Sequence, residues 1–424
     1  MRRPETTGAG FAGADRRPRV PGSRVAAVAM AVALAVGFLA RTAGAQESVF
    51  GLTFLGTSEE SGDERARGMG LLGVGLDDPK TALALNPAGL ASLPYMTISG
   101  MAVVGRRTSR DGSDELHASL ARLPHQRFAL PILGNKVVLS TGFLGLSNSS
   151  GKFKLPDRYL GTDSTAQRFE RSGTLYTIPV AIAGKVGARL RLGISLDFLL
   201  GTVNEAWTTG SDSLVTLTTR RRDEFAGRSV TFGVVGYPLP QLRLGASWNP
   251  AFDSDRDTRT TLEDIRIPGG TPLRTTSEHA VARLPQCLRA GGAYQLGTRL
   301  LLGADYLWRD WGQYRGRLYG ASSVGTESRL GGGLEWRPPH RRLVYRGGVS
   351  RHVLPQLLGD HTVNETTLHL GTGFDFTEGA GRLDMGFEYA WIGNLDRNGL
   401  VERSWRFVAS ISGQELWKRK SPRK

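Results

Sequence analysis

The chain has 424 residues, a length that suffices for one large or two ordinary domains. Of these residues 40% are hydrophobic and 22% are charged, a composition that excludes an intrinsically disordered protein. Glycine is frequent, with 56 residues and no collagen period, which indicates many strands and tight turns. The formal net charge is +15, but Lys and Arg are scattered rather than clustered, which argues against a nucleic-acid-binding protein.

The N-terminus has the layout of a secretory signal. Arginines precede the apolar run VAAVAMAVALAVGFLA at residues 25–40, and small residues follow at Ala43 and Ala45. We predict that residues 1–45 are a signal peptide, cut after Ala45. A signal anchor that stays in the inner membrane is the alternative, but the run of 16 residues is short for a span. The mature chain keeps a net charge of +10.

Beyond the leader, no apolar stretch approaches the roughly 20 residues of a membrane helix. Cys287 is the only cysteine, so no intrachain disulfide can form. If the mature chain lies in a membrane, it must therefore cross as a barrel.

Residues 68–93 read GMGLLGVGLDDPKTALALNPAGLASL and are too rich in Gly and Pro for an ordinary helix. Asp77 or Asp78 can cap a short helix with Pro79 in its first turn. Asn86 can then take the left-handed stop, and Pro87 cannot continue the helix. A phosphate-binding loop is not predicted, because no G-x-G-x-x-G follows a strand and G-K-[ST] does not occur.

From residue 95 onward the hydrophobic period is two. In RLRLGISLDFLL, at residues 189–200, the Leu, Ile and Phe side chains share one face and the Arg, Gly, Ser and Asp residues share the other. This alternation predicts strands. Fourteen such segments are expected, at residues 95–106, 114–123, 136–147, 172–185, 189–208, 213–237, 241–260, 284–296, 298–315, 327–337, 342–353, 364–377, 381–394 and 402–415.

The connections between the segments alternate in length. One set is short, such as GKVGA at residues 184–188, and the other contains long polar loops at 148–171 and 261–283. Short turns at one end and long loops at the other are typical of a bacterial outer-membrane barrel.

Three features predict that the apolar face of each strand meets lipid. The polar face carries mid-strand charges of both signs and many glycines, as the interior of a membrane barrel does. Large aromatics lie toward strand ends and fit interfacial girdles. The mid-strand charges are Arg191, Asp197, Arg243, Asp305, Arg329, Glu335, Arg346, Asp375, Asp384 and Glu388, and the aromatics are Trp207, Trp248, Trp308, Trp336 and Trp391.

The predicted fold is therefore all-β, a fourteen-stranded antiparallel transmembrane β-barrel. We expect the barrel to span residues 94–417, a basic tail to follow at 418–424, and the outer-membrane lipid of a Gram-negative-type bacterium to surround it.

The stretch A-R-G-M-G…G-x-x-D-D-P-x-T-A-x-x-x-N-P-A-G-L-A, within residues 66–92, resembles the N-terminal region of the FadL-type outer-membrane transport family. That family contains long-chain fatty acid transporters, aromatic-hydrocarbon channels and PorV-type barrels. The resemblance implies that residues 46–93 form a hatch inside the barrel. It assigns the hatch turn and the N-P-A gate to Asp77, Asp78, Pro79, Asn86, Pro87, Ala88, Gly89 and Leu90.

The resemblance also implies a function. A small hydrophobic ligand, fatty-acid-like or aromatic, would enter passively from outside, bind beside the hatch and leave sideways through the wall. The residues between strands three and four are polar, unlike the apolar groove expected of a fatty-acid capture site, so the identity of the ligand is left open. The alternative within the resemblance is a PorV-like shuttle barrel that binds secreted proteins.

Candidate site residues are few. Arg191, Arg243, Arg289 and Arg346 could hold a carboxylate ligand. Asp384 and Glu388 are expected to form ion pairs with Arg382 or Arg406 rather than an acid–base pair. The sequence has no metal-ligand spacing and no G-x-S-x-G, so we predict no metal, no cofactor and no enzymatic activity.

Overall fold

The computed structural model describes residues 48–59, 62–112, 114–133, 135–160, 163–211, 216–264, 272–317, 323–339, 343–358, 360–376 and 380–415. The predicted signal peptide and the basic tail at 418–424 lie outside the described residues.

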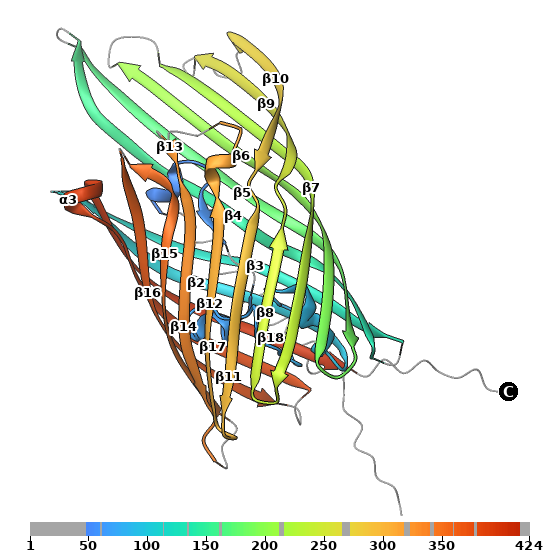
Figure 1. The fold of residues 1–424 in the computed structure, drawn as a ribbon. Helices are drawn as coiled ribbons and strands as arrows, with labels where there is room; N and C mark the ends of the chain where they lie inside the picture. Colours follow the sequence, from blue (N-terminus) through green and yellow to red (C-terminus); the bar gives the residue numbers. More distant parts are fainter. Residues whose placement is uncertain are drawn as a thin grey trace, which may run out of the picture.

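One antiparallel sheet closes on itself, because the last strand, β18, pairs with the first wall strand, β2 (Figure 1). The strands are β2 (Met96–Asp111), β3 (Asp114–Ile132), β4 (Val137–Leu160), β5 (Asp163–Val186), β6 (Leu190–Ser211), β7 (Leu217–Leu239), β8 (Leu242–Asn249), β9 (Phe252–Asp264), β10 (Arg274–Leu284), β11 (Cys287–Leu296), β12 (Leu300–Asp310), β13 (Ser323–Val324), β14 (Thr326–Trp336), β15 (Leu343–Leu358), β16 (His361–Phe376), β17 (Gly381–Asn394) and β18 (Leu400–Glu415).

These strands make fourteen crossings of the wall. β8 and β9 form one crossing that is interrupted at Pro250, and β10 and β11 form another that is interrupted at Pro285. Proline removes a ladder donor, which explains why both breaks lie there. β13 continues into β14. Each of the fourteen segments expected from the alternation corresponds to one crossing, so the predicted barrel is confirmed.

The outer face of the wall is apolar over a continuous band. On β6, Leu192, Ile194 and Leu196 are each more than 40% exposed, whereas Ser195 between them is 4% exposed. Inward charges such as Glu335 and Glu388 are buried. An apolar exterior around a polar interior is the pattern of a membrane barrel.

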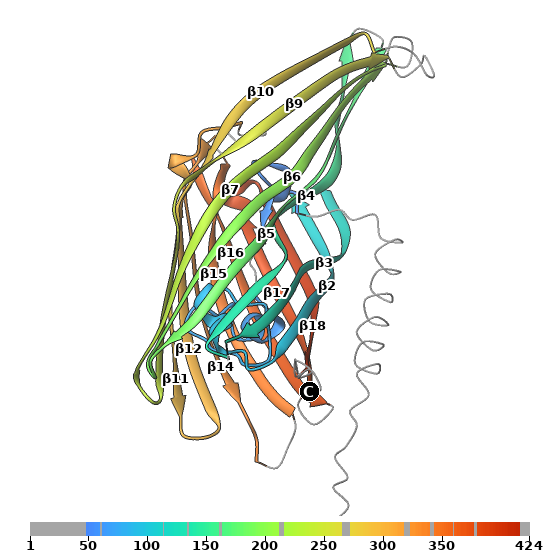
Figure 2. The same ribbon diagram turned by 90° about the vertical axis from the view of Figure 1, so that its right-hand side faces the viewer.

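The wall is much taller on one side. β4, β5, β6, β7, β9 and β10 rise above β12 and β14–β18, as Figure 2 shows. The long loops predicted at 148–171 and 261–283 are therefore wrong, since most of these residues extend β4, β5, β9 and β10. Trp207 is also not part of an outer girdle: it packs at 4.4 Å on Phe169, whose neighbour two residues on, Arg171, faces the interior.

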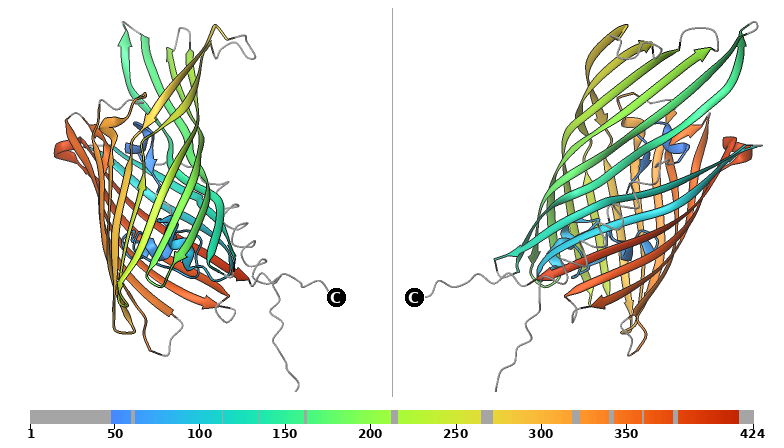
Figure 3. Two further views of the ribbon diagram at one scale, coloured as in Figure 1. Left: turned by 45° about the vertical axis from the view of Figure 1, so that its right-hand side comes forward. Right: turned by 180° about the vertical axis from the view of Figure 1, so that it is seen from behind.

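Residues 48–59 and 62–93, called here the N-terminal segment, lie inside the barrel (Figure 3). The segment contains η1 (Phe50–Leu52), β1 (Thr57–Ser58), α2 (Glu64–Gly68) and η2 (Pro87–Ser92). The short helices outside it are η3 (Trp311–Gln313) and α3 (Leu395–Asn398). Among the described residues, no helix combines the length and apolarity needed to cross a membrane.

The short helix predicted after Pro79 is wrong. Residues 80–85 are not helical, because their polar backbone groups bond elsewhere. The Ala82 N–H donates to the Ser99 hydroxyl at 2.9 Å, and the Ala84 carbonyl accepts from Arg127 at 3.3 Å. Leu83 and Leu90 pack into two different clusters with the wall. The wall therefore fixes the conformation of this stretch.

Candidate functional site

Asn86 begins a helix instead of ending one. Its φ of −111° is extended, not left-handed, and its Oδ1 accepts from the Ala88 N–H at 3.0 Å as the cap of η2. Its Nδ2 lies 3.0 Å from the Val74 carbonyl, 2.9 Å from the Val234 carbonyl and 3.2 Å from the Ala246 carbonyl. Pro87 occupies the first turn, where its missing N–H costs nothing. Asn86 thus joins η2 to β7 and β8.

Two wall glycines permit this contact. A Cβ on Gly193 would lie 2.4 Å from the Ala88 nitrogen, and a Cβ on Gly233 would lie 2.0 Å from Asn86 Oδ1. Both distances are below any real Cβ contact, and the first is to backbone, so only glycine lets η2 approach the wall this closely.

Asp77 is fixed to the wall by two strands. It accepts from the Tyr237 hydroxyl at 2.5 Å and pairs with Arg191 at 2.8 Å. The Arg191 guanidinium also lies 4.8 Å from the centre of the Tyr237 ring. Arg191, predicted as a ligand residue, is therefore placed in a contact that holds the N-terminal segment.

Asp78 links the N-terminal segment to β17. It pairs with Arg65 and with Arg382, each at 2.9 Å, and accepts the Lys80 N–H at 2.9 Å. Burial raises the pKa of Asp78, but the attraction of Arg382 and Arg65 outweighs burial and holds the pKa below its ordinary value. Asp78 is therefore ionised at neutral pH.

Helix α2 carries two further arginines into buried ion pairs. Arg65 donates to Glu335 at 2.7 Å, and Arg67 donates to Glu388 at 2.8 Å. All four side chains are at most 8% exposed. Removing one member of such a pair would leave a buried charge uncompensated, which is costly.

Arg346 lies at the centre of this network. Its side chain is fully buried and contacts Glu335 at 2.9 Å, Asp384 at 2.8 Å and Glu64 at 3.2 Å. Arg346, another predicted ligand residue, is therefore occupied by three carboxylates. The ion pairs predicted for Asp384 and Glu388 are confirmed: Asp384 pairs with Arg382 at 2.8 Å and Glu388 with Arg406 at 2.8 Å.

Two acids at the start of α2 favour protonation. Asp63 caps α2 by accepting the Ala66 N–H at 3.0 Å. Burial, followed by repulsion from Asp78 and Asp384, raises the pKa of Asp63 to about 6. Burial also raises the pKa of Glu64 well above its ordinary value, against the attraction of Arg346.

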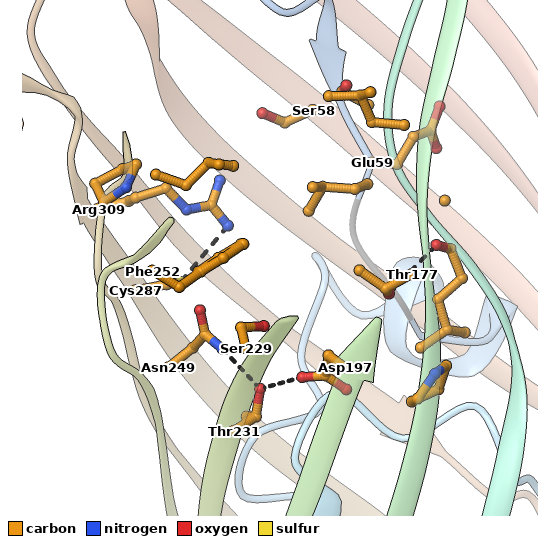
Figure 4. A pocket seen from close by; sticks show the side chains of 18 of the residues that line it. Ser58, Glu59, Thr177, Asp197, Ser229, Thr231, Asn249, Phe252, Cys287 and Arg309 are labelled. Carbon is orange, nitrogen blue, oxygen red and sulfur yellow. Dashed lines mark hydrogen bonds between the residues drawn. The ribbon is translucent and has the colours of Figure 1, made fainter. Parts of the chain in front are cut away.

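A cavity of about 150 Å³ lies between residues 54–59 and residues 84–87 of the N-terminal segment (Figure 4). Its apolar lining comes from Leu144, Leu146, Leu175, Phe252 and Leu284. Its lining also includes Glu59, Arg127, Asp197, Arg289 and Arg309. Such a mixed lining can hold a small apolar body next to one polar group.

A chain of hydrogen bonds crosses one side of the cavity. Asn249 Nδ2 donates to Thr231 Oγ1 at 3.1 Å, and Thr231 Oγ1 donates to Asp197 Oδ2 at 2.6 Å (Figure 4). The Ser195 hydroxyl donates to the other Asp197 oxygen at 2.6 Å. These polar groups satisfy one another, so a ligand without polar atoms leaves none of them unpaired.

An aromatic cluster closes one end of the cavity. Phe54 packs edge-on against Trp311 at 4.8 Å and against Tyr314 at 5.1 Å between ring centres. Leu199, Val203 and other buried wall residues complete this cluster. Arg171 fixes the N-terminal segment here by donating to the carbonyls of Leu52 and Phe54.

The wall opens beside the cavity. β3 and β4 are paired only from His125 and Leu144 toward their short turn. Beyond these residues β4 stays paired with β5 on its other edge, and β1 pairs with part of the edge that β3 has left. We call this divergence the β3–β4 fork. In the described residues, only residues 57–59 of the N-terminal segment occupy the β4 edge of the fork.

Glu59 bridges the two rims of the fork. Its backbone N–H donates to the Leu146 carbonyl of β4 at 2.8 Å, while its carboxylate forms an ion pair with Arg122 of β3. Glu59 is 8% exposed and also lines the cavity.

Of the four predicted ligand arginines, only Arg289 lines the cavity. Arg191 and Arg346 contact the N-terminal segment, and Arg243 lies near Tyr237. No sequence motif marks Glu59, Arg122 or the Asp197–Thr231–Asn249 chain as site residues. Their positions depend on where β3 and β4 separate and where the β8–β9 crossing is interrupted. The two-residue hydrophobic alternation carries no information about either feature. Among the described residues no group of His, Cys, Asp and Glu could hold a metal ion.

Solved structures share this fold. A Pseudomonas aeruginosa FadL homologue superposes with a TM-score of 0.64 at 16% identity, covering 85% of this chain and 99% of its own. The Ralstonia pickettii toluene transporter TbuX superposes with a TM-score of 0.56 at 16% identity, covering 84% of this chain and 98% of its own. The Pseudomonas putida toluene transporter TodX superposes with a TM-score of 0.55 at 14% identity, again covering 84% of this chain and 98% of its own. Identities this low establish the FadL-type fold alone.

No curated protein matches the chain. The model of the BamG family matches residues 24–422, which is nearly the whole chain. The chain therefore belongs to the BamG family.

Proposed function

We propose that this protein is an outer-membrane channel that takes up small hydrophobic compounds passively, holds them in the cavity and releases them sideways through the β3–β4 fork. The observation that carries the proposal is the position of the cavity: it adjoins a gap in the wall ladder that residues 57–59 cover. An apolar solute gains from such a pocket because its surface leaves water.

The location follows from the exterior. The exposed apolar band of the wall fits hydrocarbon, and the leader at residues 1–45 fits export. At the fork the outward residues are also apolar: Leu123 is 40% exposed, and the tilted rings of Phe143 and Tyr176 pack with their centres 4.3 Å apart. A compound leaving through the fork would therefore enter lipid directly.

The size of the cavity favours a monoaromatic ligand. A cavity near 150 Å³ is large enough for benzene in other proteins. A long-chain fatty acid would need more room than this cavity offers. Two proteins with the same fold are toluene transporters, which agrees with a ligand of this size.

In this proposal the N-terminal segment has two roles. The part from α2 to η2 is a fixed plug, since Asn86, Asp78 and Arg65 bind it to the wall. Residues 57–59 are the movable part, because they are the residues that lie on the fork itself: they form two β-bridges with β4, a hydrogen bond to Leu146 and the ion pair of Glu59 with Arg122.

Equilibrium dialysis of the purified barrel against radiolabelled toluene tests the proposal. We expect saturable binding, and we expect Ser229→Phe to abolish it, because Ser229 lines the cavity and a phenyl ring would fill it. The matched control is Val230→Phe, whose side chain points outward from the same strand. Heat-modifiable migration on gels verifies that both variants are folded. Absence of saturable binding by the folded unmodified protein would contradict the proposal.

A second candidate is a barrel that binds a secreted protein on its tall wall. The number of buried ion pairs that hold α2 favours it, because a plug so fixed suits a non-conducting barrel. Under this candidate toluene would not bind, and a secreted protein would bind equally well to the Ser229→Phe variant and to the unmodified barrel.

A further inference from the structure

The outward face of the tall wall changes character abruptly. On β6 the outward residues are apolar up to Leu200, and the next outward positions are Thr202 and Asn204. Their partners on β7 are Glu224 and Arg222. On β6 the apolar outward residues therefore end at Leu200, and on β7 they end slightly earlier, at the exposed Arg228 opposite Phe198. The outward residues farther along both strands face a polar medium.

A groove of about 570 Å³ lies on this wall beyond the band. Small polar residues of β5 and β6, Ser172 and Asn204, form part of its lining. The outward cationic side chains that line it are Lys152, Arg220, Arg222 and Arg259, and the outward carboxylate is Glu170. The groove is therefore cationic.

Two of these arginines face each other across adjacent strands. Arg222 of β7 and Arg259 of β9 are direct cross-strand partners, and both are exposed. Arg222 has a carboxylate neighbour, Glu224, at 2.7 Å. Arg259 has no acidic partner in the described part of the chain. Like charges placed directly opposite destabilise a sheet unless an anion lies between them.

Height above the band identifies the kind of anion. Asn204, in the same row as Arg222 and Arg259, lies four residues beyond Leu200. At about 3.3 Å per residue on a strand tilted near 45°, this is roughly 10 Å above the hydrocarbon. Lipid headgroups occupy that depth.

We propose that this groove binds the phosphorylated sugar headgroup of an outer-leaflet glycolipid, with Arg222 and Arg259 on a phosphate. Arginine matches phosphate in a bidentate geometry. A protein partner fits less well, because the groove has no large apolar residue for an interface core. The proposal rests on the outer-membrane location proposed above, but not on transport.

Binding of fluorescent lipid A to the full-length mature barrel in phosphatidylcholine nanodiscs tests this inference. We expect Arg222→Gln/Arg259→Gln to lower the affinity at least five-fold. The matched control is Arg106→Gln/Arg403→Gln, which removes two exposed outward arginines from β2 and β18 and should leave binding unchanged. Phosphatidylglycerol and inorganic phosphate should bind at least five-fold more weakly than lipid A.

Three results would overturn the inference: equal lipid A binding by the groove variant and the unmodified protein, an equal loss in the control variant, or equal affinity for phosphatidylglycerol or inorganic phosphate. Toluene binding, measured on the same samples, keeps the two proposals separate, because the Arg222 and Arg259 side chains do not line the cavity.

Discussion

At the scale of single residues, Asn86 makes more contacts with the wall than its place in a three-residue motif suggests. Its amide reaches three carbonyls, two of them on adjacent strands, and its oxygen caps η2. We predict that Asn86→Ala lowers the free energy of local opening of residues 84–93 by about 1–3 kcal/mol, because buried hydrogen bonds are lost. Hydrogen exchange of these amides measures the change.

Asn86→Asp separates the cap from the wall contacts. Aspartate keeps the acceptor for the Ala88 N–H but places a carboxylate against three carbonyl oxygens. Residues 84–93 should therefore open locally more readily in Asn86→Asp than in Asn86→Ala. If hydrogen exchange of these residues were the same in Asn86→Asp and in the unmodified protein, the amide contacts would contribute nothing to the stability of this segment.

Glu59 gives a second prediction at this scale. Glu59→Gln keeps the backbone bond to Leu146 but removes the ion pair with Arg122 across the fork. The loss of this attraction should raise the release rate of bound toluene several-fold while leaving the fold intact. Stopped-flow dilution measures the rate, and Arg122→Gln should give a similar increase. An unchanged rate in both variants would remove the fork from the exit path.

At the scale of elements, the alternation of hydrophobic and polar residues predicted the strands only over the part of each strand whose outer face meets lipid. Above the band the outward face no longer meets lipid, so β4 carries charged residues such as Lys152 and Lys154 there and the stretch reads as a polar loop. The N-terminal segment was mispredicted for a related reason. Residues 80–85 have helical composition, but their hydrogen bonds go to Ser99 and Arg127, far away in sequence.

Of the candidate site, the sequence could predict the residues of the N-terminal segment that contact the wall, but not the cavity. Asp77, Asp78 and Asn86 stand in a motif, and all three contact the wall. The cavity depends on the break at Pro250 and on the β3–β4 fork, both of which are properties of strand pairing.

Helix α2 should respond to pH through Asp63. The folded pKa of Asp63, about 6, is above its unfolded value of 3.8, so its contribution to stability is fully present below pH 4 and is lost as pH rises through 6. Local opening of residues 64–70 should cost about 1 kcal/mol more at pH 5 than at pH 7. Hydrogen exchange, corrected for intrinsic rates, measures this difference.

The control for this prediction is Asp63→Asn, which keeps an acceptor for the Ala66 N–H but cannot titrate. The variant should lose most of the difference between pH 5 and pH 7. The raised pKa of Glu64 acts in the same direction, whereas Asp78, with its lowered pKa, stays ionised over this range. An undiminished pH response in Asp63→Asn would assign the effect to Glu64 instead.

At the scale of the whole molecule, the interior is not a water-filled pore. The N-terminal segment places apolar side chains in five separate clusters with the wall and charged side chains between them. Each cluster removes apolar surface from water, and each ion pair satisfies a charge that the wall turns inward. Both kinds of contact hold the N-terminal segment against the wall, which is why the proposed exit is the β3–β4 fork.

The last prediction concerns the medium around the barrel. If the apolar band meets hydrocarbon, Ile194→Arg, at the middle of the band on β6, should lower the free energy of folding into a bilayer by about 2–4 kcal/mol. Thr202→Arg, outward on the same strand but beyond the band and opposite Glu224, should cost less than about 1 kcal/mol. Urea-driven unfolding from lipid vesicles measures both. In a water-soluble barrel an exposed Ile194 could be replaced by Arg at no cost, so equal stability of the two variants would mean that no lipid surrounds this wall.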